Sequence, residues 1–349
     1  MTTDPSPPSD TFRTAIIGAG LAGLSCARAL QAAGRSVTVF EKSRGTAGRM
    51  STRRLDAWHF DHGADGFSAT SPPFVAQVDA WVAEGVLARW QPRSATWQPE
   101  SGFQASRQKA RFVAQPGMSA LGRHVAKGLS VRRQQRVLSL ANQPRTWFLD
   151  LESGGREGPF HHVVIATPQE QAIPLLDGTD FPLAPLQAQP PSLPCWILMF
   201  GWNEPLALPW DRIDFVDHPH LARALRNNSK PGRPGAESWV LQLTPEASRI
   251  HLEATGDSML AMLQTELCRL LGATEPPVIT SNHRWRFAQQ AAVHPRKPGF
   301  AWDASLGIGV CGAYLEGGGV EAAWRSGKNL AASMITPLSE NKTSDLTER

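Results

Sequence analysis

The sequence has 349 residues, of which 41% are hydrophobic, and its formal net charge is +4. This hydrophobic fraction argues against general disorder and allows one large domain or two smaller ones. No lysine or arginine block is long enough for a nucleic-acid-binding arm, and no apolar run reaches the roughly 18–20 residues that a membrane span needs. We therefore expect a cytoplasmic protein with neither a nucleic-acid nor a membrane partner, and nothing in the sequence indicates its oligomeric state.

The four cysteines do not suggest a metal or redox site. They stand at positions 26, 195, 268 and 311, and no pair has the CxxC spacing. We expect buried free thiols and no bound metal.

The first motif is a glycine-rich turn between a strand and a helix. A short apolar strand, Thr14–Ile17, leads into a G-x-G-x-x-G pattern and then into helical spacing that stops at Gly34. Such glycines permit a tight turn, close approach of a pyrophosphate and close packing of helix on strand. The helix N-terminus then offers free N–H groups to phosphate. The expected cofactor-binding residues of the turn are Gly18, Ala19, Gly20, Leu21 and Ala22.

A second strand, Val37–Phe40, ends at Glu41, where a carboxylate can accept hydrogen bonds from a ribose. Three cations follow at once, Lys42, Arg44 and Arg49. An NAD enzyme does not need such a loop, whereas an extended FAD molecule needs contacts along its length. The acid and Arg49 together favour FAD, and the alternative for the three cations is a solvated loop.

The middle of the chain combines helices with strands. Residues 74–90 predict a helix with Phe74, Val78, Trp81 and Val82 on one face. From Pro168 prolines and tryptophans become frequent, which indicates a second, mainly antiparallel domain. The expected elements are helices at 117–129 and 258–271, and strands at 146–151, 162–167, 196–200, 213–216 and 239–243.

The last motif is a strand, a glycine-rich loop and a helix. Residues 306–312 read as a strand, and the glycine triplet 317–319 opens a helix without a side-chain cap. Gly312, Gly319 and Val320 are therefore further cofactor candidates. A helix N-terminus there would stabilise the negative charge of a reduced flavin, and an ordinary glycine-rich helix start is the alternative.

Several segments resemble the renalase-like flavoproteins of the FAD-dependent amine oxidase superfamily. The similar segments, in order, are "GAGLAGLSCARAL", "FEKSRGTAGRMSTRR", "DHGADGFSA", "PGMSAL", "VVIATPQEQA", "RNNSKPGR", "HRWRFA" and "VCGAYLEGGGVEAAWRSG". The resemblance covers nearly the whole chain. It implies an α/β fold with a Rossmann-like FAD-binding domain and a second, mainly antiparallel sheet-plus-helices substrate domain. The FAD-binding domain would comprise residues 12–70, 112–168 and 295–336, and the substrate domain 71–111 and 169–294, with flexible tails at 1–11 and 337–349.

The resemblance also implies an activity. Renalases oxidise mis-reduced dihydronicotinamide isomers of NAD(P)H, passing hydride to flavin and electrons to oxygen, which yields hydrogen peroxide. Two alternatives remain open: an amine oxidase or desaturase-like enzyme with an altered pocket, and a flavin-binding protein with little turnover. By matching positions, Glu41 would hold the adenosine ribose. The other implied cofactor contacts are Lys42, Arg49, Met50, Ala64, Val137 and Thr167.

The sequence departs from the renalase pattern at three places. Ala47 replaces a loop glycine, and Asp65 and Gly66 replace a polar–aromatic pair beside the flavin. Ala313 replaces an acidic residue whose carboxylate would bond to the cofactor. Asp65 could therefore pair with a cationic amine or repel an anionic substrate, although a turn-forming aspartate is an equally good interpretation.

Two further catalytic candidates lie in "HRWRFA". On a strand, His283 and Trp285 would share one face and Arg284 would take the other. His283 could neighbour the substrate, and the alternative is a hydrogen-bonded structural histidine. Asn228 and Lys230 could shape the pocket entrance, or could belong to a plain polar loop.

Overall fold

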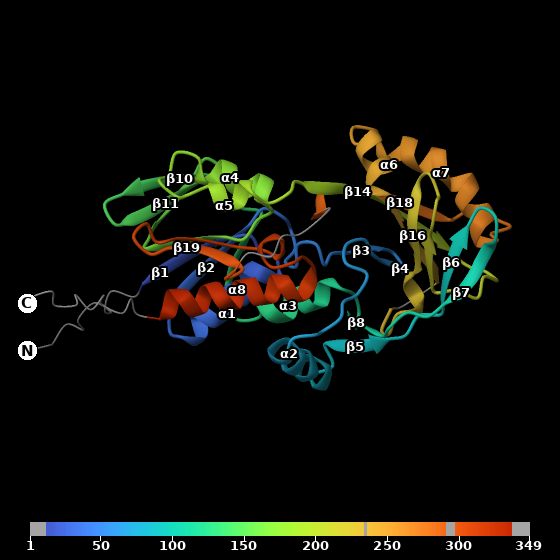
Figure 1. Ribbon diagram of the computed structural model, residues 1–349, viewed down its shortest axis with the longest axis horizontal. Helices are drawn as coiled ribbons and strands as arrows, with labels where there is room; N and C mark the ends of the chain where they lie inside the picture. Colours follow the sequence, from blue (N-terminus) through green and yellow to red (C-terminus); the bar gives the residue numbers. More distant parts are fainter. Residues whose placement is uncertain (1–11, 234–235, 291–296, 337–349) are drawn as a thin grey trace, which may run out of the picture.

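A mostly parallel six-stranded sheet forms the centre of one lobe of the computed structural model (Figure 1). The structure describes residues 12–233, 236–290 and 297–336; the predicted tails, 1–11 and 337–349, lie outside them. Neighbouring strands are parallel except at the β19 edge. In spatial order the strands are β19 (Phe300–Asp303), β20 (Ile308–Cys311), β13 (His162–Ile165), β1 (Arg13–Ile17), β2 (Ser36–Glu41) and β9 (Ser130–Arg133).

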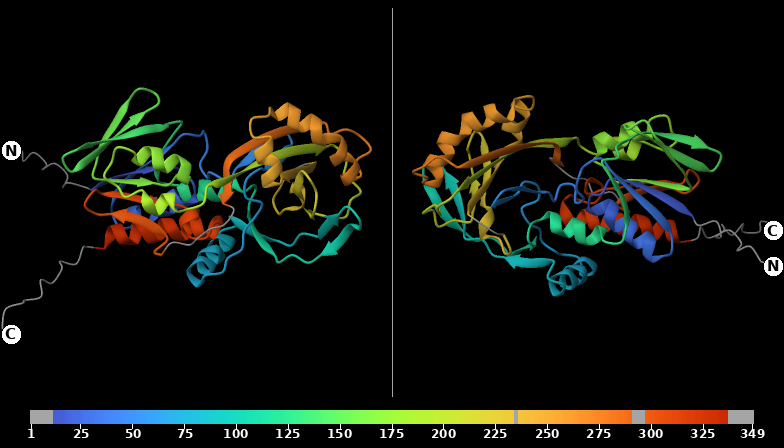
Figure 2. Two further views of the ribbon diagram at one scale, coloured as in Figure 1. Left: turned by 45° about the horizontal axis from the view of Figure 1, so that its top comes forward. Right: turned by 180° about the vertical axis from the view of Figure 1, so that it is seen from behind.

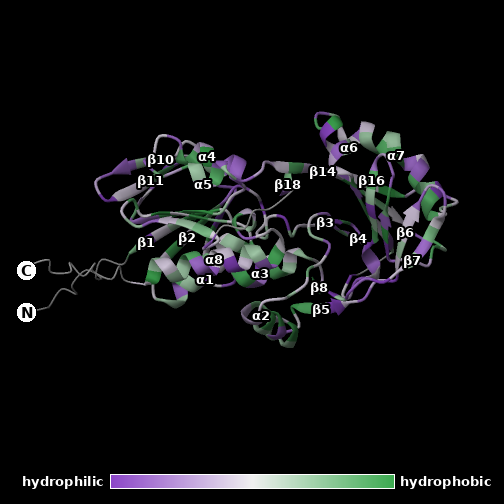
Figure 3. Cartoon of the chain, in the orientation of Figure 1, coloured by the Kyte–Doolittle hydropathy of each residue, from purple (hydrophilic) through white to green (hydrophobic). Residues whose placement is uncertain are grey.

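Each face of this sheet is covered by a different layer. Ile16, Val39 and Val164 pack towards the helices, whereas their neighbours Ile17 and Phe40 pack towards a small antiparallel sheet. Alternate residues along each strand therefore serve two cores, and the buried strands are correspondingly apolar (Figure 3). The helical layer contains α1 (Leu21–Ala32), α3 (Ser119–Ala126) and α8 (Gly319–Ile335). The other contains β10 (Val137–Gln143), β11 (Thr146–Leu151), β12 (Arg156–Phe160), α4 (Gln169–Leu176) and α5 (Ala184–Gln187).

The second lobe is built on a seven-stranded sheet (Figure 2). Its neighbours pair antiparallel, except β15 with β6. Helices α6 (Pro245–Ile250) and α7 (Gly256–Leu271) pack on one face, and the opposite face meets the hairpin β3 (Thr52–Leu55) and β4 (Trp58–Asp61). The strand order is β18 (Ile279–Gln290), β14 (Ser192–Trp202), β17 (Glu237–Leu243), β16 (Leu221–Arg226), β15 (Arg212–Phe215), β6 (Ser94–Gln98) and β7 (Gly102–Ser106). We call the face towards the hairpin the inner face.

The helix expected over residues 74–90 is too long. Helix α2 spans Pro72–Ala83, and Leu87–Trp90 form strand β5, which pairs antiparallel with β8 (Arg111–Ala114). Val82 is 38% exposed instead of facing inward. The apolar spacing of this stretch suits either structure, and pairing with a strand about twenty residues further on decides it.

The other expected elements are present. Strands β11, β14, β15 and β17 and helices α3, α7 and α8 lie where the sequence predicts them, within a few residues. The prediction of a Rossmann-like α/β fold with a second, mainly antiparallel sheet is confirmed. The domain boundaries stay a prediction; α4, expected in the substrate domain, packs against the core of the first lobe. Within the described ranges, no helix is both long and apolar enough to cross a membrane, and no group of side chains has the make-up of a metal site.

Candidate functional site

The glycine turn after β1 has the backbone geometry that a dinucleotide needs. Gly18 has φ +108°, and a Cβ there would lie 2.9 Å from the Ala166 carbonyl oxygen. No atom lies within 4 Å of the position that a Gly20 Cβ would take, so the entrance to α1 is open. Gly20 is the N-cap of α1 and makes no side-chain capping bond. The first N–H groups of α1 are therefore available to phosphate oxygens.

Glu41 is tied directly to this turn. It is the last residue of β2 and is buried, and its carboxylate accepts hydrogen bonds from the backbone N–H groups of Ala19 (2.8 Å) and Ser43 (2.7 Å). Each carboxylate oxygen keeps a further lone pair, which a ribose hydroxyl could use.

We call residues 42–50, the segment after Glu41, the cofactor loop. Its Arg49 connects this loop with the second lobe. The loop lies on the turn because the Ala47 N–H donates to the Ala19 carbonyl oxygen at 2.9 Å. From there Arg49 Nη1 donates to the carbonyl oxygen of Ala288, on β18, at 3.0 Å. Burial lowers the pKa of Arg49, while the nearby acidic groups of Glu170 and Tyr314 oppose that shift. Arg49 is thus a partly buried cation between the lobes and not a solvated loop residue, whereas Lys42 is exposed.

The remaining implied contacts are Ala64, Met50, Val137 and Thr167. The Ala64 N–H donates to the Arg49 carbonyl oxygen at 2.8 Å, and Met50 and Val137 are buried. Thr167 lies beside Gly18, and its hydroxyl is buried with no hydrogen-bond partner in the described chain. A buried hydroxyl without a partner costs free energy, and a bound cofactor would supply the partner.

The C-terminal motif reaches the same edge of the sheet. Gly312 follows β20, and its N–H donates to the hydroxyl of Ser326 on α8 at 2.9 Å. Helix α8 begins at Gly319 without a side-chain cap. Since β20, β13, β1 and β2 are parallel neighbours, Gly312, Thr167, Gly18 and Glu41 lie at their adjacent carboxyl ends. Ala313 is buried there, and Val320 belongs to the first turn of α8.

An aromatic cluster occupies the inner face next to this edge. The rings of His283 and Trp285 lie 4.4 Å apart, as expected for alternate residues of one strand. Trp285 also stacks on His62 with 5.7 Å between ring centroids and donates its indole N–H to the His62 carbonyl oxygen at 2.7 Å. His62 directly precedes Gly63 and Ala64, so the cluster adjoins the cofactor loop. The sequence interpretation missed His62, although "DHG" stands in the renalase-like segment.

Both histidines of this cluster are uncharged at neutral pH. Burial lowers the pKa of His62 to about 4, assisted by His283 and Arg53. Burial lowers the pKa of His283 to about 4, again assisted by Arg53. The Nδ1 atom of His62 is buried and has no hydrogen-bond partner among the described residues.

Asp65 is surrounded by arginines. It is buried, and its carboxylate accepts hydrogen bonds from Arg111 Nη2 at 3.0 Å and Arg212 Nη1 at 3.3 Å, with Arg223 at 3.6 Å. The same carboxylate cannot freely pair with an amine, because two guanidinium groups already bind it. The role of Asp65 in catalysis stays a prediction.

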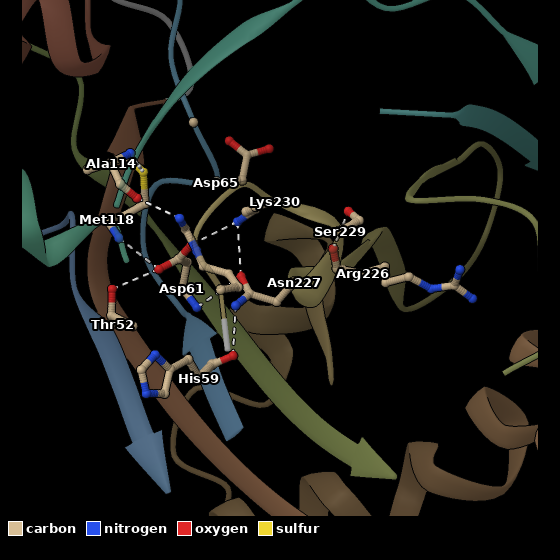
Figure 4. Close-up of polar contacts among 12 residues, drawn as sticks. Thr52, His59, Asp61, Asp65, Ala114, Met118, Arg226, Asn227, Ser229 and Lys230 are labelled. Atoms are coloured by element: carbon tan, nitrogen blue, oxygen red, sulfur yellow. Dashed lines mark hydrogen bonds and ion pairs between the residues drawn. The ribbon is translucent and has the colours of Figure 1, made fainter. Parts of the chain in front are cut away.

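A second buried charge cluster ties the hairpin β3–β4 to the segment after β16 (Figure 4). Asp61, at the end of β4, accepts from Lys230 at 3.1 Å and from Arg233 at 2.6 Å, and all three side chains are fully buried. Burial alone would raise the pKa of Asp61, but the two cations hold it below its usual range. Lys230 also donates to the side chain of Asn227 at 3.1 Å. Lys230 is therefore neither at a pocket entrance nor in a plain polar loop, while Asn228 bonds to Glu237 at 3.1 Å.

Comparison with known proteins identifies the family. Residues 78–335 match the model of flavin-containing amine oxidoreductases. The chain belongs to this family. Residues 16–80 also match the model of an NAD(P)-binding Rossmann-like domain. As a flavin-containing amine oxidoreductase, the protein is a flavin-dependent enzyme, and the expected membership of the amine oxidase superfamily is confirmed.

Individual relatives agree with this assignment. Renalase of Mus musculus is 24% identical over 311 residues, which are 82% of this chain and 88% of that protein. A 4,4'-diapophytoene desaturase of Staphylococcus haemolyticus is 47% identical over 49 residues, but these are only 14% of this chain and 10% of the desaturase. The structure of a triple mutant of putrescine oxidase has a TM-score of 0.70 at 15% identity and covers 93% of this chain and 99% of its own. At that identity, the likeness shows the fold alone.

The geometry fits the flavin that the family implies. Two uncapped helix N-termini, the open space at Gly20, the Glu41 carboxylate and the Thr167 hydroxyl, which is unpaired among the described residues, all lie at one edge of the sheet. The assignments of single residues to the cofactor stay predictions.

Proposed function

We propose that this protein is an FAD-dependent oxidase of the renalase type. Its substrate would be a dihydronicotinamide, such as a mis-reduced isomer of NAD(P)H, or a similar nitrogen heterocycle. The substrate loses a hydride, and the two electrons pass on to oxygen, which gives hydrogen peroxide after taking up two protons. The bound FAD would supply the hydride acceptor.

The observation that carries this proposal is the neutral aromatic cluster of His62, His283 and Trp285 beside the cofactor loop. A dihydropyridine ring that gives up hydride becomes aromatic and does not need to lose a proton. Such a reaction requires a dry contact surface and good positioning rather than a charged base. Two uncharged imidazoles and an indole would supply such a surface, with Trp285 stacked on His62 and the His283 ring edge-on to both.

His62 would orient the substrate as well as pack against it. Its buried Nδ1 atom has no hydrogen-bond partner within the described part of the chain, and a neutral imidazole can donate or accept one hydrogen bond at each nitrogen. A carboxamide on the substrate ring could satisfy it.

The cofactor would be held by the chain's own groups at the sheet edge. The N-terminus of α1 would bind the pyrophosphate and Glu41 the ribose, while Arg49 would lie along the extended molecule. The N-terminus of α8 would favour negative charge on the reduced ring system.

An amine oxidase is the second candidate, because the family model carries that name. The surroundings of Asp65 do not favour it, since Arg111 and Arg212 occupy the carboxylate that would bind a protonated amine.

Anaerobic mixing of the FAD-loaded protein with substrates tests the proposal. We expect dihydronicotinamide isomers to bleach the visible flavin absorbance and amines such as putrescine to leave it unchanged, with hydrogen peroxide forming when oxygen is admitted. Bleaching by amines alone would establish the second candidate. Bleaching by neither class would contradict both and leave a flavin-binding protein with little turnover.

A further inference from the structure

A cluster of charged residues on the inner face of the seven-stranded sheet is not used by the proposed chemistry. It consists of Arg111, Arg212 and Arg223 with Asp65 and Asp214, and we call it the arginine cluster. It joins β8, β15 and β16 to the segment that follows His62. Three guanidinium groups face two carboxylates, so one positive charge within the cluster is not neutralised.

One arginine of the cluster is structural. Arg212 is bound by Asp214 through Nε (2.8 Å) and Nη2 (2.9 Å) and donates its third nitrogen to Asp65. Only 6% of its side chain is exposed. All of its guanidinium nitrogens are therefore occupied, and it fixes both carboxylates in place.

The other two arginines keep unused donors. Arg223 donates Nε to Asp214 at 2.7 Å and Nη1 to the side chain of Gln242 at 3.3 Å, and 29% of its side chain is exposed. Arg111 donates only Nη2 to Asp65 and to the Gly66 carbonyl oxygen, and its buried Nε has no hydrogen-bond partner within the described ranges. Its side chain is 26% exposed. A buried, charged donor without an acceptor is costly unless a ligand supplies one.

The cluster lies on the same sheet face as the aromatic cluster. From β18 through β14, β17 and β16 to β15, the directly paired residues are His283, Ile197, Gln242, Arg223 and Asp214. Opposite residues of paired strands project to the same face. Three strand spacings of about 4.8 Å separate His283 from Arg223, a distance of roughly 14 Å.

From this geometry we infer that Arg111 and Arg223 form a binding subsite for an anionic group of the substrate. The ligand would be a phosphate or carboxylate that is joined by a linker to the ring held at His62 and Trp285. This inference rests on the proposed function for the identity of the ring, but the anion site itself does not depend on it. The separation favours a group carried on a spacer, such as a ribosyl phosphate, over a charge attached directly to the ring.

Binding of simple anions to the FAD-loaded protein tests the subsite without any turnover. At constant ionic strength, we expect inorganic pyrophosphate and phosphate to bind in calorimetry. Acetate serves as the carboxylate probe and shows which of the two anion types is preferred. Loss of one charge-assisted hydrogen bond in Arg223→Gln or Arg111→Gln should weaken binding by about 10- to 100-fold.

A substitution that should strengthen anion binding distinguishes a ligand site from a cluster with a structural role alone. Replacement of Asp65 by Asn removes the carboxylate that competes for both arginines, so anion binding should become tighter by about tenfold or more. If the cluster had a structural role alone, Asp65→Asn would lower the stability of the protein and would not raise its affinity for anions. Arg93→Gln is the matched control, because Arg93, which directly precedes β6, forms a similar pair with Asp211 at 2.8 Å but has a 60% exposed side chain. If Arg111→Gln does not fold, Arg223→Gln and Arg223→Lys carry the comparison.

Absence of anion binding to the wild type, equal weakening by Arg93→Gln, or unchanged affinity in Asp65→Asn would overturn the subsite. These outcomes are distinct from failure of the proposed function. A neutral dihydronicotinamide riboside that reduced the flavin with the same KM as its phosphorylated form would contradict only the subsite. Anion binding by a protein whose flavin no dihydronicotinamide reduces would contradict only the proposed substrate.

Discussion

At the scale of single residues, Glu41 has two tasks. Its carboxylate fixes the glycine turn through Ala19 and Ser43, and it remains able to accept from a ribose. We predict that Glu41→Gln weakens FAD binding by about 10- to 100-fold, because hydrogen bonds to a charged acceptor are lost. Titration of the apoprotein with FAD, followed by flavin fluorescence, measures this. Glu246→Gln is the control, since Glu246 is exposed and, in the described part of the chain, pairs with Arg249 one helix turn away; equal affinity in both variants would contradict the role of Glu41.

Ala313 offers a test in which a substitution should make FAD binding tighter. It stands where the renalase-like pattern has a carboxylate, at the buried end of β20. Ala313→Asp should retain FAD more tightly through dialysis, by about threefold to tenfold, if one hydrogen bond to the cofactor is restored. Ala313→Asn has the same size without the charge and should gain less. Unchanged or weaker retention in Ala313→Asp would remove Ala313 from the cofactor site.

The paired histidines make stability depend on pH. Because the pKa values of folded His62 and His283 lie near 4, the unfolded chain binds more protons as soon as the pH falls below about 6.5. The free energy of unfolding should thus be highest above pH 6.5 and fall steadily towards pH 4. In His283→Phe the loss between pH 7 and pH 5 should be smaller by about 1 kcal/mol, roughly half of the full linkage value because the imidazole is only partly buried. Urea unfolding at the two pH values measures it, and an unaltered slope would refute the assignment.

At the scale of elements, helices α1 and α8, which both follow glycine-rich turns, pack closely against each other. A Cβ on Gly327 of α8 would lie 2.0 Å from the carbonyl oxygen of Ala22 on α1. Gly327→Ala should therefore push the helices apart and lower the free energy of unfolding by about 1–3 kcal/mol. It should also weaken FAD binding, because both helix N-termini belong to the proposed cofactor site.

Gly155→Ala serves as the control for this variant. No atom lies within 4 Å of the position of its Cβ, and it stands in the exposed turn before β12. Thermal unfolding of both variants, with and without FAD, gives the comparison. A Gly327→Ala protein as stable as the wild type would show that the helices adjust freely.

Local patterns in the sequence predict the elements that depend on neighbours along the chain. The β1–α1–β2 unit follows from glycine spacing and apolar periodicity within about thirty residues, and α8 follows from its repeat. The boundary between α2 and β5 does not, because Leu87–Trp90 becomes a strand only through pairing with Arg111–Ala114. The sequence also does not predict the arginine cluster or the Asp61–Lys230 pair. Asp61 and Lys230 are 169 residues apart, and nothing near either residue indicates its partner.

At the scale of the whole molecule, Asp61, Lys230 and Arg233 bind the hairpin β3–β4 to the segment after β16. All three side chains are buried, so removal of Asp61 leaves two buried cations without their anion. Asp61→Asn should destabilise the protein by about 3–5 kcal/mol, and Asp61→Asn combined with Lys230→Met should recover part of that loss. Urea unfolding of the single and double variants gives the coupling energy, and additive losses would argue against the ion pair.

The order of the strands also governs when this protein can acquire its cofactor. Strand β1 begins the described chain, yet its sheet is completed by β20, and α8, the second helix of the proposed cofactor site, starts only at Gly319. A growing polypeptide has made the turn, Glu41 and Arg49 long before it has made α8. Contacts this distant in sequence also form late during folding, because closing the intervening loop costs entropy first. We therefore predict that flavin loading follows synthesis of nearly all the residues described here, because the proposed cofactor site needs the N-termini of both helices.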